Sequence, residues 1–159
     1  MSITIIVAIG ENNELGKANG LIWHIKEDLK FFKEHSMGKP CVMGLNTFYS
    51  LPKMLPGRKH IVLSDVEVEL PEGVEVFHDM DSLMNYVKQI PDEIMIIGGA
   101  SMYRQFLPYA DKMLITEIHA SSPADVYFPE FNKDDWNRTL LYSVEENGLK
   151  FDHVEYVRK

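Results

Sequence analysis

The amino-acid sequence predicts an α/β fold, in which helices cover both faces of a mainly parallel sheet. Two observations lead to this expectation. Short apolar runs rich in β-branched residues alternate with helical patterns, and one of these runs, residues 94–97, is apolar at every position. Alternating strands and helices are joined by crossovers, which make neighbouring strands parallel, and a strand covered on both faces can be apolar throughout. The 159 residues are about one domain's length, so we expect a single domain over residues 1–159.

The individual elements follow in order along the chain. β-Branched apolar runs predict strands, whereas Asn or Ser near the start of a segment, or acidic residues in its first turn, favour helices. The predicted strands are residues 3–9, 41–43, 60–63, 74–77, 94–97 and 113–118. The predicted helices are residues 26–35, 46–51, 81–89 and 101–107.

The last third of the chain changes to an alternation of period two. Residues 137–144 and 149–157 show this pattern, and an Asn-Gly pair lies between them. Asn-Gly between alternating segments is a strong hairpin signal, so we expect a C-terminal antiparallel hairpin at the edge of the sheet. Residues 65–75 carry five acidic residues and a Pro-Glu-Gly sequence, which predicts an exposed edge or a loop.

Composition and charge indicate a soluble globular protein and argue against binding to nucleic acids or membranes. Hydrophobic residues make up 45% of the chain and charged residues 25%, as in ordinary soluble globular proteins. Sixteen Lys and Arg against twenty-four Asp and Glu give a net charge of -8, which repels phosphate backbones and anionic lipid. We therefore expect neither a nucleic acid nor a membrane as a partner.

The N-terminal segment and the cysteine content indicate a cytoplasmic protein. Residues 3–9 are apolar but too few to span a bilayer, and they lack the basic leader and cleavage site of a secretory signal. The single cysteine, Cys41, cannot form an internal disulfide and is predicted to be a small buried residue.

The helix predicted at residues 26–35 places a carboxylate among apolar side chains. Asp28 precedes Phe31 by three residues and Phe32 by four, so the three share one helix face, while Glu27 points elsewhere. Burial disfavours the ionised form of a carboxylate, which is how acids are tuned for proton transfer near neutral pH. The alternative is that both acidic residues only complement the helix dipole.

Two glycine-bearing segments are candidate binding elements. Residues 10–20 form a polar stretch with three glycines, longer than an ordinary connection, which indicates a lid or a binding loop. Gly98 and Gly99 follow a buried type of strand and precede a helix. Close backbone approach and a helix N-terminus favour a bound phosphate, although a simple tight turn is the alternative.

A basic turn completes the candidates. Arg58 and Lys59 follow a Pro-Gly turn, which could clamp a carboxylate or phosphate or could simply be solvated. The six histidines show no metal-ligand spacing, so no metal site is expected.

Taken in order, these segments resemble bacterial chromosomal dihydrofolate reductases over essentially the whole chain. Several motifs in one order and at compatible spacing are far more specific than any one of them. The motifs are Leu15-Gly16, Leu21-x-Trp23, Asp28-Leu29-x-x-Phe32, Met43-Gly44-x-x-Thr47-Phe48, Leu55-Pro56-Gly57-Arg58, Ile97-Gly98-Gly99 with Tyr103, Thr116, and Asp125-x-x-Phe128-Pro129.

The resemblance implies a fold and an activity. It implies an eight-stranded sheet flanked by about four helices, with a cleft that binds 7,8-dihydrofolate and NADPH. The implied enzyme is a monomeric NADPH-dependent oxidoreductase that reduces dihydrofolate to tetrahydrofolate by hydride transfer, supplying one-carbon metabolism and thymidylate synthesis.

The resemblance also implies roles for the substrate site. Asp28 would hold the amino-pyrimidine edge of the pterin and promote protonation of the ring nitrogen, Trp23 would position a water, and Thr116 would hydrogen-bond the carboxylate. Leu21 is grouped with these catalytic residues, and Arg58 would clamp the α-carboxylate of the glutamate tail. The other implied substrate contacts are Ile6, Val7, Leu29, Phe32, Leu55, Ile97 and Tyr103.

For the cofactor, the resemblance implies contacts from four parts of the chain and a cis peptide between Gly98 and Gly99. Leu45 departs from the family, which commonly has Arg there; the change removes a cation expected near the 2'-phosphate, for which Lys39, Lys59 or His60 could compensate. The implied cofactor contacts are Ala8, Leu15, Gly16, Leu21, Gly44, Leu45, Asn46, Thr47, Leu63, Ser64, Ile97, Gly98, Gly99, Ala100, Ser101, Met102 and Tyr103.

Two other functions remain open on the sequence. One is a reductase of the same fold that acts on another pterin or pyrimidine, against which Asp28 together with Arg58 favours folate. The other is a catalytically silent binding protein that keeps the cleft without turnover.

Overall fold

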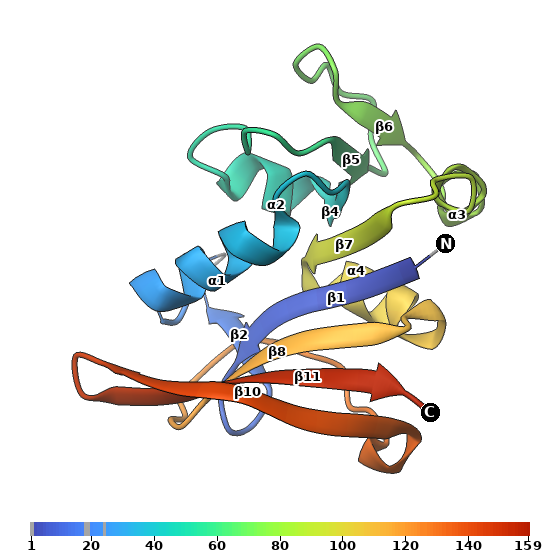
Figure 1. The fold of residues 1–159 in the computed structure, drawn as a ribbon. Helices are drawn as coiled ribbons and strands as arrows, with labels where there is room; N and C mark the ends of the chain where they lie inside the picture. Colours follow the sequence, from blue (N-terminus) through green and yellow to red (C-terminus); the bar gives the residue numbers. More distant parts are fainter. Residues whose placement is uncertain (1, 18–19, 24) are drawn as a thin grey trace.

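An eight-stranded sheet forms the centre of the computed structural model, which describes residues 2–17, 20–23 and 25–159 (Figure 1). Residues 18 and 19 of the predicted lid loop, and His24, lie outside the described residues. The strands of the sheet are β1 (Ser2–Ile9), β4 (Cys41–Gly44), β5 (His60–Leu63), β6 (Glu75–Phe77), β7 (Glu93–Gly98), β8 (Lys112–Ile118), β10 (Trp136–Glu146) and β11 (Leu149–Arg158).

The strand order confirms the predicted mixture of parallel and antiparallel pairs. It is β10-β11-β8-β1-β7-β4-β5-β6. Pairing is parallel from β8 through β1, β7, β4 and β5 to β6, whereas β11 runs antiparallel to both β8 and β10. The predicted strands and helices are all present, with bounds that differ by at most two residues.

Four α-helices flank the sheet, α1 and α2 on one face and α3 and α4 on the other (Figure 1). The N-terminus of α3 is capped by Asp79, whose carboxylate accepts a hydrogen bond of 2.7 Å from the backbone N–H of Ser82. The helices are α1 (Lys26–Ser36), α2 (Leu45–Ser50), α3 (Met80–Val87) and α4 (Ala100–Phe106), with 3-10 helices at Leu107–Tyr109 and Lys133–Asp135.

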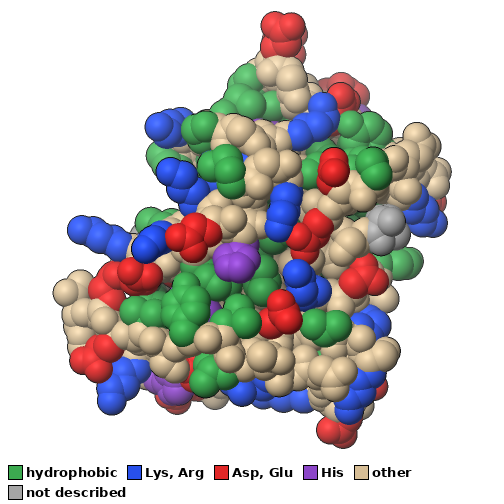
Figure 2. Space-filling view, in the orientation of Figure 1, with side chains coloured by type: hydrophobic (Ala, Val, Ile, Leu, Met, Phe, Trp, Pro, Cys, Tyr) green, Lys and Arg blue, Asp and Glu red, His purple; other side chains and the backbone are tan. Residues whose placement is uncertain are grey.

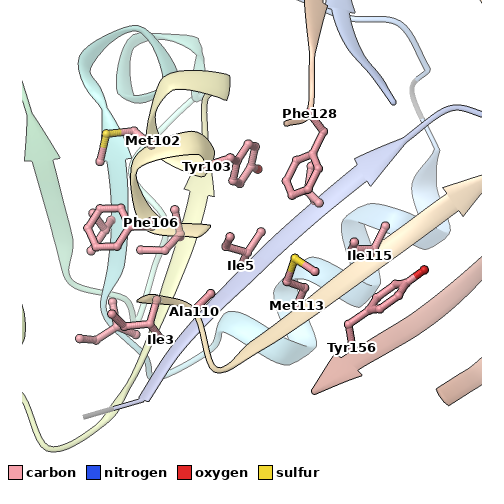
Figure 3. Packing of buried hydrophobic residues seen from close by; sticks show 14 of the residues in the cluster. Ile3, Ile5, Met102, Tyr103, Phe106, Ala110, Met113, Ile115, Phe128 and Tyr156 are labelled. Atoms are coloured by element: carbon pink, nitrogen blue, oxygen red, sulfur yellow. The ribbon is translucent and has the colours of Figure 1, made fainter. Parts of the chain in front are cut away.

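Alternation along β1 divides the core between the two faces of the sheet. Ile3 and Ile5 are fully buried against α3 and α4, where Phe106 also lies, as Figure 3 shows. Ile6 points to the opposite face and packs with Phe31 of α1. Cys41 is fully buried, as predicted.

The C-terminal hairpin turns at the predicted Asn-Gly pair. Asn147 and Gly148 both have positive φ, 54° and 80°, as a two-residue hairpin turn of type I' requires. A bulge near Leu141 interrupts the pairing of the edge strand β10. Figure 2 shows hydrophobic side chains over this hairpin, and Leu140 and Tyr142 are exposed there.

A small second sheet was not predicted. It contains β2 (Glu14–Lys17), β3 (Gly20–Leu21) and β9 (Val126–Tyr127), in the order β3-β2-β9. The stretch predicted as a loop at residues 10–20 is thus partly extended and paired with a segment more than a hundred residues away. These strands have only two to four residues each, too few to show an apolar alternation by which sequence could identify them.

Glu14 anchors this second sheet. Its carboxylate is buried and accepts backbone hydrogen bonds from Asn12 (2.6 Å) and Ser122 (2.8 Å). Burial acts to raise the pKa of Glu14, but the backbone N–H donors outweigh it and the pKa lies below its usual value. The charged side chain therefore joins two loops at the carboxyl end of β1.

A cluster of charges lies at the amino ends of the central strands. Glu93, at the start of β7, accepts hydrogen bonds from Thr4 and from Lys39 (2.6 Å), and it pairs with Lys112 at 3.2 Å. Burial opposes ionisation, yet these partners lower the pKa of Glu93 to about 2. The cluster therefore ties three strands together at the edge of the sheet away from the paired glycines.

Candidate functional site

The candidate residues gather at the carboxyl ends of the parallel strands, where open α/β sheets bind their ligands. The ends of β1, β7 and β8 contribute Ala8, Gly98 and Thr116, and the first turn of α1 contributes Asp28. The structure therefore brings together side chains that are far apart in the sequence.

Asp28 and Thr116 form the polar centre of this site. The Thr116 hydroxyl donates a hydrogen bond of 2.6 Å to Asp28 Oδ1. Thr116 is buried on β8, and Asp28 is half-buried. Burial raises the pKa of Asp28 above its usual value, and the hydrogen bond from Thr116 only partly opposes this. Asp28 is thus a carboxyl group tuned to take up a proton more readily than an exposed one.

Apolar side chains border Asp28 on the face of the sheet that α1 covers. Ile6, Phe32 and Ile97 belong to one cluster there, together with the buried Phe31. Such walls exclude water and strengthen polar interactions beside them.

Four other predicted substrate contacts are placed differently from these walls. Leu29 is 61% exposed on the outer side of α1, and the side chain of Val7 packs against the opposite face of the sheet. Tyr103 is buried, and its hydroxyl donates to the backbone carbonyl of Ile6 at 2.9 Å. Leu55 is half-buried in the loop before β5.

Arg58 lies at the other end of α1. Its guanidinium donates to Ser36 Oγ at 3.1 Å and to the backbone carbonyl of Pro56 at 3.0 Å, and it lies 6.0 Å from the centre of the Phe32 ring. At a rise of 1.5 Å per residue, Ser36 is roughly 12 Å along the helix from Asp28. Since a guanidinium has five N–H donors, Arg58 retains donors for a carboxylate at that distance.

A cavity of about 570 Å³ lies on the other side of the glycine pair. Predicted cofactor contacts from the ends of β4, β5 and β7 and from the starts of α2 and α4 line it. The lining residues are Gly44, Leu45, Asn46, Thr47, Leu63, Ser64, Asp65, His78, Asp79, Met80, Gly99, Ala100, Ser101, Met102 and Gln105. A cavity of this volume, lined by five different elements, suits a dinucleotide better than a metal or a small anion.

The glycine pair joins the two parts of the site. The peptide between Gly98 and Gly99 is cis, as the resemblance implied. Gly98 has a φ of 130°, and a Cβ atom there would lie 3.4 Å from Thr47 Oγ1 and 3.5 Å from the Tyr103 hydroxyl. These are ordinary van der Waals distances, so it is the positive φ, which residues with a side chain rarely adopt, that favours glycine at this position.

The cations suggested to compensate for Leu45 lie elsewhere. Lys39 pairs with Glu93 at the opposite edge of the sheet, and Lys59 pairs with Glu75 at 3.4 Å. His60 is buried, and its Nε2 accepts a hydrogen bond from the backbone N–H of Leu55.

The described lining of the cavity instead contains two acidic residues, Asp65 and Asp79, and one histidine, His78, but neither Lys nor Arg. The suggestion of a compensating cation among Lys39, Lys59 and His60 is thus wrong.

The predicted lid contacts lie beside the carboxyl end of β1. Ala8 and Trp23 pack around Ile25. Leu15 packs against the main core, and Gly16 of β2 pairs with Leu21 of β3. The side chain of Leu21 lies outside the description.

Gly10 was missed as a contributor to this site. A Cβ atom there would lie only 2.5 Å from the Trp23 ring and 2.6 Å from Glu14 Oε1. A lone glycine at the end of a strand gives no sign of such a neighbour.

His153 was also missed. It is fully buried on β11, and its Nδ1 lies 2.9 Å from Thr116 Oγ1. The period-two pattern of the hairpin could have assigned it to the inward face, but only the strand pairing of β11 with β8 reveals its neighbour.

Two structural absences hold for the described part of the chain. No group of three or more His, Cys, Asp or Glu residues is placed there to hold a metal ion. None of its helices has the length and apolar character to cross a membrane.

Known proteins match this chain over almost its whole length. The family model described as dihydrofolate reductase matches residues 2–158. Dihydrofolate reductase of Haemophilus influenzae is 41% identical over 136 residues, covering 86% of this chain and 84% of the relative. Dihydrofolate reductase type 3 of Salmonella typhimurium is 40% identical over 162 residues, covering 100% of this chain and 99% of the relative.

A solved structure agrees with these relatives. Dihydrofolate reductase from Enterococcus faecalis, complexed with NADP(H) and RAB-propyl, has a TM-score of 0.90 to this chain at 30% identity, covering 99% of this chain and 96% of that one. The strand order, the cis glycine pair and the half-buried Asp28 described above are found together with these similarities. The chain therefore belongs to the dihydrofolate reductase family, whose known reaction is the NADPH-dependent reduction of dihydrofolate.

Proposed function

We propose that this chain reduces 7,8-dihydrofolate to 5,6,7,8-tetrahydrofolate as an oxidoreductase acting on a CH–NH group, with Asp28 as its catalytic acid. The observation that carries the proposal is the Asp28–Thr116 pair beside the glycine pair and its cavity. An acid for the pterin and a pocket for a dinucleotide thus share one edge of the sheet. The direct test is loss of NADPH absorbance on addition of dihydrofolate; no oxidation would instead support the silent binder.

The residues divide the work of this reaction. Thr116 engages Asp28 Oδ1, which leaves Oδ2 to bind the amino-pyrimidine edge of the pterin. The raised pKa of Asp28 favours a proton that can be passed toward the ring nitrogen beside the carbon that accepts hydride. NADPH supplies that hydride when it is bound. Ile6 and Phe32 shield the reacting rings from water, and Trp23 positions a water near Asp28.

The cavity is proposed to hold the cofactor by its pyrophosphate and adenosine. Gly99 and Ala100 offer backbone groups at the start of α4, and Thr47 does so from the start of α2. Ser64 also lines the cavity, but its hydroxyl donates to the Val66 carbonyl at 2.7 Å and its backbone N–H donates to the Phe77 carbonyl at 2.8 Å.

The organisation and location of the chain are also proposed. Residues 1–159 act as one monomeric domain in the cytoplasm, without a nucleic-acid or membrane partner. The main sheet, which takes strands from both ends of the chain, supports one domain. The net charge of -8 supports the absence of phosphate-backbone and anionic-lipid partners.

Replacing Arg58 by Leu is expected to weaken dihydrofolate binding about 10- to 100-fold and to leave NADPH affinity unchanged. The charge-assisted hydrogen bonds lost are worth roughly 1.5–3 kcal/mol. Separate equilibrium titrations with each ligand measure the two affinities. Lys59→Leu is the control, since it removes a charge from the same turn. Equal losses for both ligands would show that Arg58 only supports the fold through Ser36 and Pro56.

Replacing Leu45 by Arg is expected to raise the preference for NADPH over NADH about 10-fold or more. A guanidinium at the start of α2 would pair with the 2'-phosphate, which only NADPH carries. The ratio of kcat/KM for the two cofactors measures this preference, and Leu45→Met controls for side-chain size. An equal change for both cofactors would contradict the placement of the 2'-phosphate beside Leu45.

A further inference from the structure

A buried histidine lies directly behind the Asp28–Thr116 pair. His153 is fully buried on β11, opposite Thr116 of the neighbouring strand β8. Its Nδ1 is 2.9 Å from Thr116 Oγ1. Its ring is stacked on Phe31, with ring centres 4.0 Å apart and planes 7° apart. Three elements therefore hold the imidazole in one orientation.

The single hydroxyl proton of Thr116 decides the direction of both hydrogen bonds. Thr116 Oγ1 lies 2.6 Å from Asp28 Oδ1 and 2.9 Å from His153 Nδ1. An ionised carboxylate can only accept, so the hydroxyl must donate to Asp28. Its remaining capacity is as an acceptor, which requires a proton on Nδ1 of His153. The polar chain thus runs from His153 through Thr116 to Asp28.

The other ring nitrogen supports the same assignment. Nε2 of His153 is buried, and among the described residues it has no hydrogen-bond partner. With the proton on Nδ1, Nε2 carries only a lone pair and is an unpaired acceptor. The opposite tautomer would bury an unpaired N–H donor, a rarer and costlier arrangement in proteins.

The surroundings keep the ring neutral. Burial among Phe31, Tyr142 and Phe151 lowers the pKa of His153 to about 4. The titratable groups that act on its pKa are His35 of α1, which lowers the pKa further, and Asp152 of β11, which raises it. Asp28, also on α1, is linked to His153 through Thr116, and Tyr142 of β10 packs its ring against the imidazole.

We propose that His153 is a positioning residue: by donating to Thr116 Oγ1, it keeps the Thr116 hydroxyl oriented as the donor to Asp28 Oδ1. Because Oδ1 is then occupied by a donor, the proton that Asp28 takes up goes to Oδ2, the oxygen that faces the substrate in the proposed function. The catalytic role of these hydrogen bonds rests on that proposed function, but the directions of the hydrogen bonds do not.

The first experiment reads the tautomer without substrate or turnover. Long-range proton–nitrogen NMR on the full chain labelled with 15N-histidine, at neutral pH, should show the ring of His153 protonated at Nδ1 and bare at Nε2. Its signals should disappear in His153→Phe, which keeps a flat ring against Phe31, or in His153→Leu if that variant folds better. A His153 ring protonated at Nε2, or at both nitrogens, would overturn the proposal.

The second experiment tests whether His153 acts through Thr116. Carbon NMR titration of the Asp28 carboxyl group follows its pKa in the free protein. His153→Phe should raise this pKa by about 0.5, because Thr116 becomes a weaker donor. In a Thr116→Val background the same change should have no effect, and His153→Asn, with an amide N–H near the place of Nδ1, should restore the original pKa.

The outcomes separate this inference from the proposed function. An equal rise in both backgrounds would mean that His153 only packs against α1, and it would overturn the positioning role. The expected His153 tautomer and the expected Thr116-dependent change in the Asp28 pKa, found in a protein without reductase activity, would overturn the proposed function. They would still support the hydrogen bonds from His153 through Thr116 to Asp28.

Discussion

Asp28→Asn is expected to slow hydride transfer to dihydrofolate by roughly 10²- to 10⁴-fold at neutral pH, the usual effect of removing a general acid. An amide at this position still accepts the hydrogen bond from Thr116, but it has no proton to pass on. The loss should shrink at low pH, where solvent supplies the proton. Single-turnover rates measured across the acidic and neutral range test both statements.

The fold should survive this replacement. A raised pKa means that the ionised form of Asp28 opposes folding above that pKa, so an uncharged residue relieves the cost. Asp28→Asn should therefore be at least as stable as the parent at neutral pH and bind NADPH equally well. Glu27→Gln, which removes a charge from the same turn of α1, is the matched control. A fully active Asp28→Asn enzyme would end the assignment of Asp28 as the acid.

Gly98→Ala is expected to abolish tight NADPH binding and to destabilise the protein by about 1–3 kcal/mol. The residue has a φ of 130°, which residues with a side chain rarely adopt, so an alanine there strains the backbone. The peptide that joins the cavity to the Asp28 site would then have to move. Fluorescence titration with NADPH and unfolding in urea measure the two effects.

Gly148→Ala is the matched control for this substitution. Gly148 also has a positive φ, 80°, but it lies in the hairpin turn with nothing within 4 Å of its Cβ position. It should lose stability through backbone strain alone and keep its affinity for NADPH. If Gly98→Ala lost stability but bound NADPH normally, the glycine pair would be only a tight turn.

The elements that sequence predicted are those with a local physical signal. The apolar run at residues 94–97 predicts a central strand because both of its faces are covered, and Asn147-Gly148 predicts the hairpin because only such residues accept two positive φ values in succession. Asp28 could be singled out because its helix spacing to Phe31 is local.

The features that sequence missed depend on pairing between distant segments. Glu14 is an ordinary acid in a polar stretch until Ser122 donates to it, and His153 is one of six histidines until β11 pairs with β8. The supposed compensating role of Lys39 failed for the same reason, since only the strand order shows that it lies by Glu93. Chain neighbours carry no information about these contacts.

Asp28 and Glu93 lie at opposite ends of the central strands, and their environments move their pKa values in opposite directions. On acidification Asp28 therefore gains its proton first, while Glu93 still holds Lys39 and Lys112. The stabilisation from Glu93 is complete above about pH 4.5, the ordinary value for Glu, and fades as pH falls toward about 2. Mild acid thus protonates Asp28 before it protonates Glu93. Mildly acidic conditions can therefore populate the enzyme with a protonated Asp28 while the ion pairs of Glu93 at the amino ends of the strands stay intact.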